Sequence, residues 1–194
     1  MDKGESKICN RRIVVRGHLQ GIGFRPYTAR MAKKHGVCGY IRNSWGNVEI
    51  FAQGTEEQVT AFLNDIKEPK LAFAFVEEIE ELALGDLEGR IFDGFRIEES
   101  NSGEVDGPVY IPVDLPICES CAAELENTED RRFSYPLNSC VACGPRFSII
   151  RRLPYDRENT SMDVFEMCPE CKKEYTTMGS RRHHAQTIGC KECG

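Results

Sequence analysis

The sequence predicts an α+β protein, in which a βαββαβ domain is followed by a small irregular module of two metal-binding fingers with four cysteines each. Three observations support this class. Apolar residues follow strand-like and helix-like periods along residues 8–100, turn formers and prolines fill residues 101–117, and eight cysteines form four Cys-x-x-Cys pairs within residues 118–194. We therefore expect a sheet domain, a linker and a duplicated cysteine module (118–143 and 168–193).

The first strand and the first helix are joined by a glycine-rich turn. Ile13-Val14-Val15 begin a strand that runs into the turn at residues 17–24, and a helix is expected from Arg25 to His35. Glycines between a strand and a helix let successive backbone N–H groups face one concavity, and the helix N-terminus adds its positive dipole. The turn therefore predicts an anion site. The alternative is a glycine-rich turn that only connects the strand to the helix.

The remainder of the first domain is expected to contain a hairpin, a second helix and two further strands. Residues 37–43 and 48–52 are strands joined by a tight turn. Thr55 and Gln58 occupy the positions of a capping box, and apolar residues at i, i+3, i+4 and i+7 form one face of the next helix. Strands at 73–76 and 95–97 complete the βαββαβ order, with an additional edge strand and both helices on one face of the sheet. The apolar helix face is Val59, Phe62, Leu63 and Ile66.

The cysteine module is an internal duplication. Its second half repeats the first 50 positions later, as Glu124 recurs at Glu174 and Arg131-Arg132 at Arg181-Arg182. Two thiolates spaced i, i+3 can bind one tetrahedral metal ion, and two such pairs complete a four-sulfur site. Four pairs therefore predict two metal ions. The duplication favours pairing within each repeat, and a crossed arrangement stays open. The pairs are Cys118/Cys121, Cys140/Cys143, Cys168/Cys171 and Cys190/Cys193, separated by 18, 24 and 18 residues.

Other uses of these cysteines fit the sequence less well. The polar N-terminus is unlike a signal peptide and no segment is apolar enough to span a membrane, so we expect a cytoplasmic protein with reduced thiols. A thioredoxin-like pair needs a single Cys-x-x-Cys in a βαβ setting, and an iron–sulfur cluster usually takes a more compact run. Two structural Zn²⁺ ions are the favoured interpretation. Cys9 and Cys38 lie outside the array and are expected to be half-buried thiols.

The charge balance argues against a general nucleic-acid binder. The chain has 31 acidic and 25 basic residues and a net charge of −6, whereas a phosphate backbone requires a basic surface. Arginines cluster at 131–132, 146, 151–152 and 181–182. We interpret them as solvated loops that offset thiolate charge, and binding of an anion or RNA is the alternative.

Two motifs of the first domain resemble the acylphosphatase family. The run Val15-Arg16-Gly17-His18-Leu19-Gln20-Gly21-Ile22-Gly23-Phe24-Arg25 is similar to the family loop V-x-G-x-V-Q-G-V-G-F-R, and Gly39-Tyr40-Ile41-Arg42-Asn43 to its G-[aromatic]-x-x-N motif. The resemblance implies a ferredoxin-like fold in which Arg25 binds the phosphate of an acyl phosphate and Asn43 orients the attacking water. It also implies that the loop amides bind this phosphate, and these amides belong to Gln20, Gly21, Ile22, Gly23 and Phe24. Leu19 and Ile22 replace the commoner valines, and the turn after Asn43 is one residue shorter.

With the cysteines included, the whole chain resembles the N-terminal part of the HypF family, the carbamoyltransferases of [NiFe]-hydrogenase maturation. The resemblance implies hydrolysis of carbamoyl phosphate to carbamate and phosphate by the first domain. It also implies that domains beyond Gly194 use ATP to form carbamoyl-adenylate and pass the carbamoyl group to a cysteine of the partner HypE. The runs that carry it are Gly23-Phe24-Arg25-Pro26, Cys140-x-x-Cys143-Gly144-Pro145-Arg146-Phe147, Pro154-Tyr155-Asp156-Arg157-x-Asn159-Thr160 and His184-Ala185-Gln186.

Several assignments stay open at this point. The alternative function is a free-standing acylphosphatase with a zinc-dependent module for partner docking. His183 and His184 are interpreted as structural, because eight cysteines already fill two tetrahedral sites. Residues 155–157 either contact absent domains or form a tight turn between the fingers. Trp45, in the hairpin turn, either docks a partner or covers the glycine-rich loop.

Overall fold

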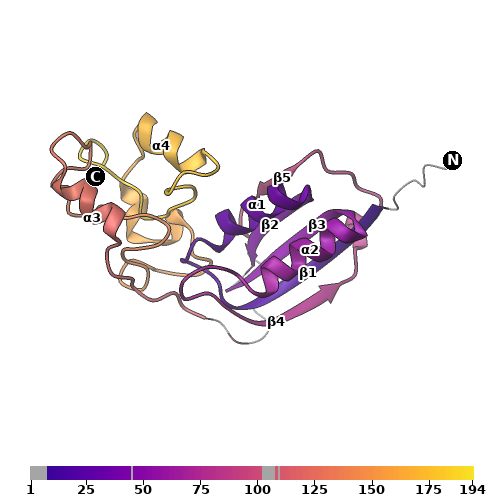
Figure 1. Cartoon of the computed structure of the whole chain (residues 1–194). Coiled ribbons are helices and arrows are strands. Elements are labelled where there is room, and N and C mark those ends of the chain that lie inside the picture. The colour runs from indigo at the N-terminus through magenta and orange to yellow at the C-terminus, as the bar shows by residue number, and fades with distance from the viewer. Residues whose placement is uncertain (1–7, 45, 102–107, 109) are drawn as a thin grey trace.

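The structure is a computed structural model, and it describes residues 8–44, 46–101, 108 and 110–194. Two units lie side by side: a sheet domain that begins the chain and a cysteine-rich module that ends it (Figure 1). Trp45, for which docking or covering is expected, lies outside the described residues, as do residues 102–107 and 109 of the expected linker.

The first unit is a five-stranded sheet with two helices on one face (Figure 1). Neighbouring strands are antiparallel except β2 and β5, which run parallel. This arrangement confirms the expected βαββαβ order, with β5 as the additional edge strand. The strands are β1 (Ile8–His18), β2 (Cys38–Ser44), β3 (Asn47–Thr55), β4 (Phe75–Leu82) and β5 (Phe95–Ile97), in the order β4-β1-β3-β2-β5, and the helices are α1 (Phe24–His35) and α2 (Glu56–Lys67).

Local sequence signals explain where the helices begin and end. Gly36 adopts the left-handed conformation and ends α1, while Thr55 and Gln58 form the expected capping box of α2. The apolar face of α2 enters the core, where Phe62 and Ile66 are fully buried against side chains of both helices and the central strands. Side chains of β1 and α1 belong to this core, so the turn between them is anchored at both ends.

Strand β4 differs from its expected range. The expected strand covered residues 73–76, but Phe73 has a φ of 65° and is 61% exposed, and the strand runs from Phe75 to Leu82. The glutamates of β4 interrupt the alternation of apolar and polar residues that predicts a strand. They pair with arginines of the neighbouring β1, with Arg11 to Glu81 at 2.9 Å and Arg16 to Glu80 at 2.7 Å. Cross-strand ion pairs therefore accompany a strand in which hydrophobic alternation is weak.

The second unit has little regular structure and repeats itself. Helices α3 (Glu119–Glu126) and α4 (Pro169–Thr176) each begin directly after the first cysteine of a repeat. Short 3₁₀ helices are η1 (Gly85–Leu87) in the first unit and η2 (Arg157–Asn159) and η3 (Ser161–Val164) in the second. The apolar clusters of the module are small and consist largely of its cysteines. Among the described residues, no helix has the length and apolar character needed to cross a membrane.

Candidate active site and metal centres

The eight paired cysteines form two four-sulfur groups. Within each group the sulfur atoms lie within 4.8 Å of one another. The Sγ–Sγ distance is 3.8 Å from Cys118 to Cys140 and 3.6 Å from Cys171 to Cys193. A tetrahedral ion with metal–sulfur bonds of ~2.3 Å requires sulfur–sulfur distances of about 3.8 Å, so both groups fit such an ion. The first group is Cys118, Cys121, Cys140 and Cys143, and the second is Cys168, Cys171, Cys190 and Cys193, so the grouping follows the repeats.

The arginine pairs lie between these groups, and each reaches the sulfur atoms of the other repeat. Arg131, in the first repeat, donates to the Sγ atoms of Cys168 and Cys190 at 3.2 and 3.1 Å. Arg181, in the second repeat, donates to Cys121 Sγ at 3.5 Å. Hydrogen bonds from a cation favour the thiolate form of a cysteine. Each finger therefore supplies positive charge to the sulfur site of its neighbour.

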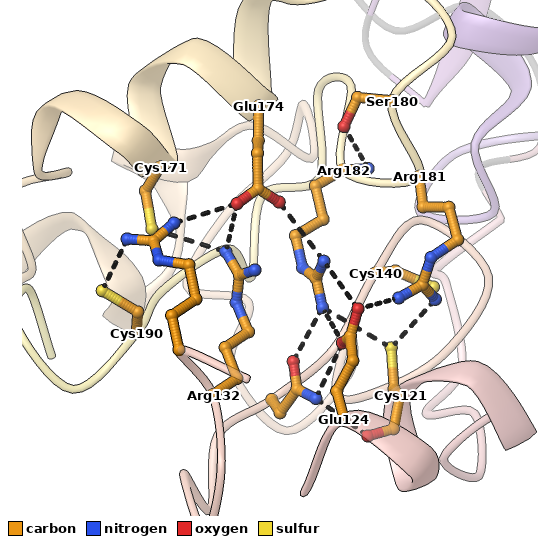
Figure 2. A network of polar contacts seen from close by, with 12 residues as sticks. Cys121, Glu124, Arg132, Cys140, Cys171, Glu174, Ser180, Arg181, Arg182 and Cys190 are labelled. Atoms are coloured by element: carbon orange, nitrogen blue, oxygen red, sulfur yellow. Dashed lines mark hydrogen bonds and ion pairs between the residues drawn. The ribbon is translucent and has the colours of Figure 1, made fainter. Parts of the chain in front are cut away.

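Two glutamates hold the arginines in place (Figure 2). Glu124 contacts Arg181 and Arg182, and Glu174 contacts Arg132 and Arg182 at 3.0 and 3.2 Å. Burial alone would raise the pKa of Glu124, but hydrogen bonds from Arg182 and Asn138 lower that pKa to about 2. Arg132 and Arg182 are only 3% and 4% exposed, so the expectation of solvated loops is wrong for them. They offset carboxylate and thiolate charge from inside the module.

The glycine-rich turn presents its backbone at the start of α1. Gly21 and Gly23 have φ values of 73° and 79°, a region that glycine adopts without strain, and Gly23 is the N-cap of the helix. Arg25 lies in the first turn of the helix, and Asn43 lies near the end of β2. A helix N-terminus beside consecutive loop amides is a ready anion site.

Arg25 and Asn43 point to the same oxygen atom. Arg25 Nη2 and Asn43 Nδ2 donate to the main-chain oxygen of Tyr155 at 3.2 and 3.4 Å. The main-chain N–H of Tyr155 in turn donates to Gln20 Oε1 at 2.9 Å. Three candidate residues of the first unit therefore converge on one residue of the cysteine module.

The neighbouring residue of the module forms an ion pair with Arg25. Arg25 Nη1 lies 2.7 Å from Asp156 Oδ1, and both side chains are 10% exposed. Arg157 turns away and donates to the main-chain oxygens of Gln186 and Ile188, each at 2.8 Å. Within the described chain, residues 155 and 156 thus contact the first unit, a role that the sequence analysis did not anticipate. Their only sequence signal was the Pro-Tyr-Asp-Arg run.

Arg146 connects the first sulfur group to the glycine-rich loop. Its side chain is fully buried, and Nη2 donates to the main-chain oxygens of Cys140 and Val141 at 3.1 and 3.0 Å. Its Nε donates to the main-chain oxygen of Gly21. A Cβ at Gly21 would lie 2.7 Å from Pro112 and 2.9 Å from Arg146, so the linker and the module pack tightly against the loop. The expectation that Arg146 is solvated is wrong.

Residues of both units line a small, partly open cavity at this junction. Its volume is about 30 Å³, and a groove of about 660 Å³ lies beside it and shares Arg25 and His184. Burial and the charge of Arg25 lower the pKa of His184 to about 3, so its imidazole stays neutral. Neither His183 nor His184 belongs to a four-sulfur group. The cavity is lined by Gln20, Arg25 and Asn43 from the first unit and by Arg146, Tyr155 and Gln186 from the second.

Comparisons with known proteins identify both units. The family model described as Acylphosphatase matches residues 11–97, and the model described as HypF finger matches residues 117–150 and 167–194. The carbamoyltransferase HypF of Rhodobacter capsulatus is 39% identical over 183 residues, covering 94% of this chain and 24% of that protein. The chain belongs to the HypF family.

Other HypF proteins and acylphosphatases support this placement. The crystal structure of full-length HypF in the phosphate- and nucleotide-bound form has a TM-score of 0.87 at 37% identity, covering 100% of this chain and 25% of that one. An acylphosphatase of Actinobacillus succinogenes is 37% identical over 92 residues, which is 99% of that protein and 47% of this chain. The expected fold class and the HypF resemblance are therefore confirmed, and the chain spans about a quarter of the HypF length.

Proposed function

We propose that this chain hydrolyses carbamoyl phosphate to carbamate and phosphate at the junction of its two units. The observation that best supports this proposal is the convergence of Arg25 and Asn43 on one oxygen atom beside the glycine-rich loop. An acyl phosphate needs donors for its phosphoryl oxygens and a positioned water, and these two residue types supply both.

In the proposed mechanism the loop and Arg25 hold the phosphoryl group while Asn43 orients water. The water oxygen attacks phosphorus as the bond from phosphorus to the carbamate oxygen breaks. A phosphoryl oxygen can take the proton of the water, and carbamate leaves as a stable carboxylate, so no side-chain base is required. Arg25 has five N–H donors. Tyr155 and Asp156 use two of its nitrogens in this structure, and other N–H groups remain for phosphate oxygens.

We further propose that each four-sulfur group binds one Zn²⁺ as a structural ion. Four thiolates complete a tetrahedral shell and leave no position for water or substrate, so such an ion folds the module without taking part in hydrolysis. In a complete carbamoyltransferase, ATP-dependent domains outside this chain would consume the carbamate and transfer the carbamoyl group to HypE in the cytoplasm. The present chain would perform the first step.

A phosphate-release assay tests the hydrolysis, with carbamoyl phosphate and acetyl phosphate compared on one preparation of known zinc content. Arg25→Ala should lower the rate about a hundred- to a thousandfold, because an oriented donor to the transferred group is lost. The matched control is Arg30→Ala on the exposed side of the same helix, which should leave the rate unchanged. Undiminished release by Arg25→Ala would reject the site. Much faster turnover of acetyl phosphate would favour a general acylphosphatase with a docking module.

A further inference from the structure

One buried amide of the second finger has an unpaired donor. Gln186 is 3% exposed, and among the described residues its Nε2 atom has no hydrogen-bond partner. Buried amide groups are nearly always paired, because an unpaired donor has lost its bonds to water without replacement. An exception at the wall of a candidate site indicates a ligand that accepts the missing bond.

The remaining polar atoms of Gln186 are held by its own module. The hydroxyl of Tyr175 donates to Oε1 at 3.1 Å, and Arg157 Nη1 donates to the main-chain oxygen at 2.8 Å. The ring of Tyr175 is packed against His184, with the ring centroids 4.9 Å apart. Because the oxygen end of the amide is occupied, its NH₂ end is left to face another acceptor.

The location of Gln186 indicates what that acceptor is. Gln186 lines the small cavity at the glycine-rich loop together with Gln20, Arg25 and Asn43. The cavity is small, and polar side chains of both units line it. Arg25 and Arg146 bring two positive charges to its walls against the one negative charge of Asp156, which is paired with Arg25, and the loop amides add further donors, so an oxyanion fits best. We propose that Gln186 donates a hydrogen bond to a phosphoryl oxygen of the ligand bound at this loop.

This inference rests on the proposed function, because it adds a residue to the same phosphate site. It also extends the site beyond the first unit. The acylphosphatase of Actinobacillus succinogenes matches this chain over 92 residues, a length that leaves no counterpart for the finger module. The substrate site of the present chain would instead be completed across two units, with Gln186 supplied by the second finger.

The test measures binding of inorganic phosphate to the full chain by phosphorus NMR titration or calorimetry, without turnover. Gln186→Glu keeps the size of the side chain and an acceptor for Tyr175, but it replaces the amide donor with a second carboxylate oxygen. Gln186→Leu removes the amide altogether. We expect the Kd for phosphate to rise about tenfold in Gln186→Leu, as for loss of one hydrogen bond to a charged group. The rise should be larger in Gln186→Glu, because like charges then face each other.

A purely structural role makes different predictions. It would lower the melting temperature or the zinc content of the Gln186 variants and leave the Kd of the folded fraction unchanged. Tyr175→Phe is the matched control, since it loosens the amide but keeps its donor, and its Kd should rise less than that of Gln186→Leu. Arg25→Ala in the same assay separates the two proposals. If Arg25→Ala weakens phosphate binding and both Gln186 variants bind as tightly as wild type, this inference is overturned while the loop site stands. If Arg25→Ala also binds as wild type, the proposed function fails.

Discussion

The two units of this chain are stabilised by different interactions. The sheet domain buries large apolar side chains, such as Phe62, Ile41 and Ile50, each with no exposed surface. The finger module buries arginines instead, with Arg132 and Arg182 enclosed between two sulfur groups and two glutamates. Apolar burial stabilises a fold by itself, whereas buried cations require fixed negative charge nearby. The first unit should therefore fold without metal, and the second should not.

The candidate site lies where these two kinds of structure meet. The sheet domain supplies the glycine-rich loop, Arg25 and Asn43, and the module supplies Tyr155, Asp156 and Arg146. Arg146 joins carbonyls of the first cysteine group to the loop. The geometry of the candidate site on the sheet domain thus depends on contacts from the finger module.

Metal removal should produce the largest effect. A strong chelator should unfold the module and leave the sheet domain folded, because thiolate repulsion replaces metal bonds only in the module. Phosphate release should fall at the same time, since Arg146 and Tyr155 would leave the loop. Amide exchange resolved by residue, followed during chelation, measures both units on one sample. Simultaneous loss of protection in β1, β3 and the module would contradict the expectation that the sheet domain stays folded without metal.

Phe62→Ala makes the opposite test, because it weakens the core of the sheet domain and leaves the sulfur groups intact. It should destabilise that unit by about 3–5 kcal/mol through lost burial and a cavity, and zinc content should stay at the wild-type level. Urea unfolding of the sheet domain, with zinc content measured in parallel, gives both quantities. Zinc loss in the folded variant would show that the units are not independent.

Sequence reasoning succeeded where the signal is local. The capping box of Thr55 and Gln58 requires residues three apart, and the sulfur grouping follows a duplication of fixed offset. It failed for the arginines, because their spacing is the same whether a loop is solvated or buried. The contact of Arg25 with Asp156 joins residues 131 positions apart (156 − 25), and nothing in either segment specifies the other. A site built across two units is therefore only half visible in the sequence.

Arg131 and Arg181, which donate to sulfur atoms of the other repeat, provide a test within the finger module itself. Arg131→Ala should weaken metal retention in the second sulfur group, and Arg181→Ala in the first, each by about tenfold, because partners that orient metal ligands commonly contribute that much. Cadmium NMR distinguishes the two groups once single Cys→Ser variants assign the signals. Arg151→Ala removes an exposed arginine paired with Asp163 and is the control. A larger effect on the sulfur group of the variant's own repeat would contradict the expectation that each arginine acts on the sulfur group of the other repeat.

The smallest effect concerns acid stability of the sheet domain. Glu49 accepts hydrogen bonds from Tyr40 and Arg42, both at 2.8 Å, and from Arg12 at 3.0 Å. Burial alone would raise the pKa of Glu49, but the bonds from Arg42 and Tyr40 lower it below its ordinary value of 4.5. A lowered folded-state pKa contributes stability above the unfolded-state pKa, and this stability is lost as the pH falls through the folded-state value.

The two units should therefore lose their structure in different pH ranges. The module loses its metal as the cysteines gain protons, and this competition begins well above the range in which Glu49 titrates. The sheet domain should remain folded after that loss and weaken only below about pH 4.5. Glu49→Gln should flatten this acid limb in urea unfolding followed through sheet-domain signals, with zinc release recorded on the same samples. If zinc release and sheet unfolding instead share one pH midpoint in wild type and Glu49→Gln alike, the module and not the Glu49 cluster sets the acid stability of the whole chain.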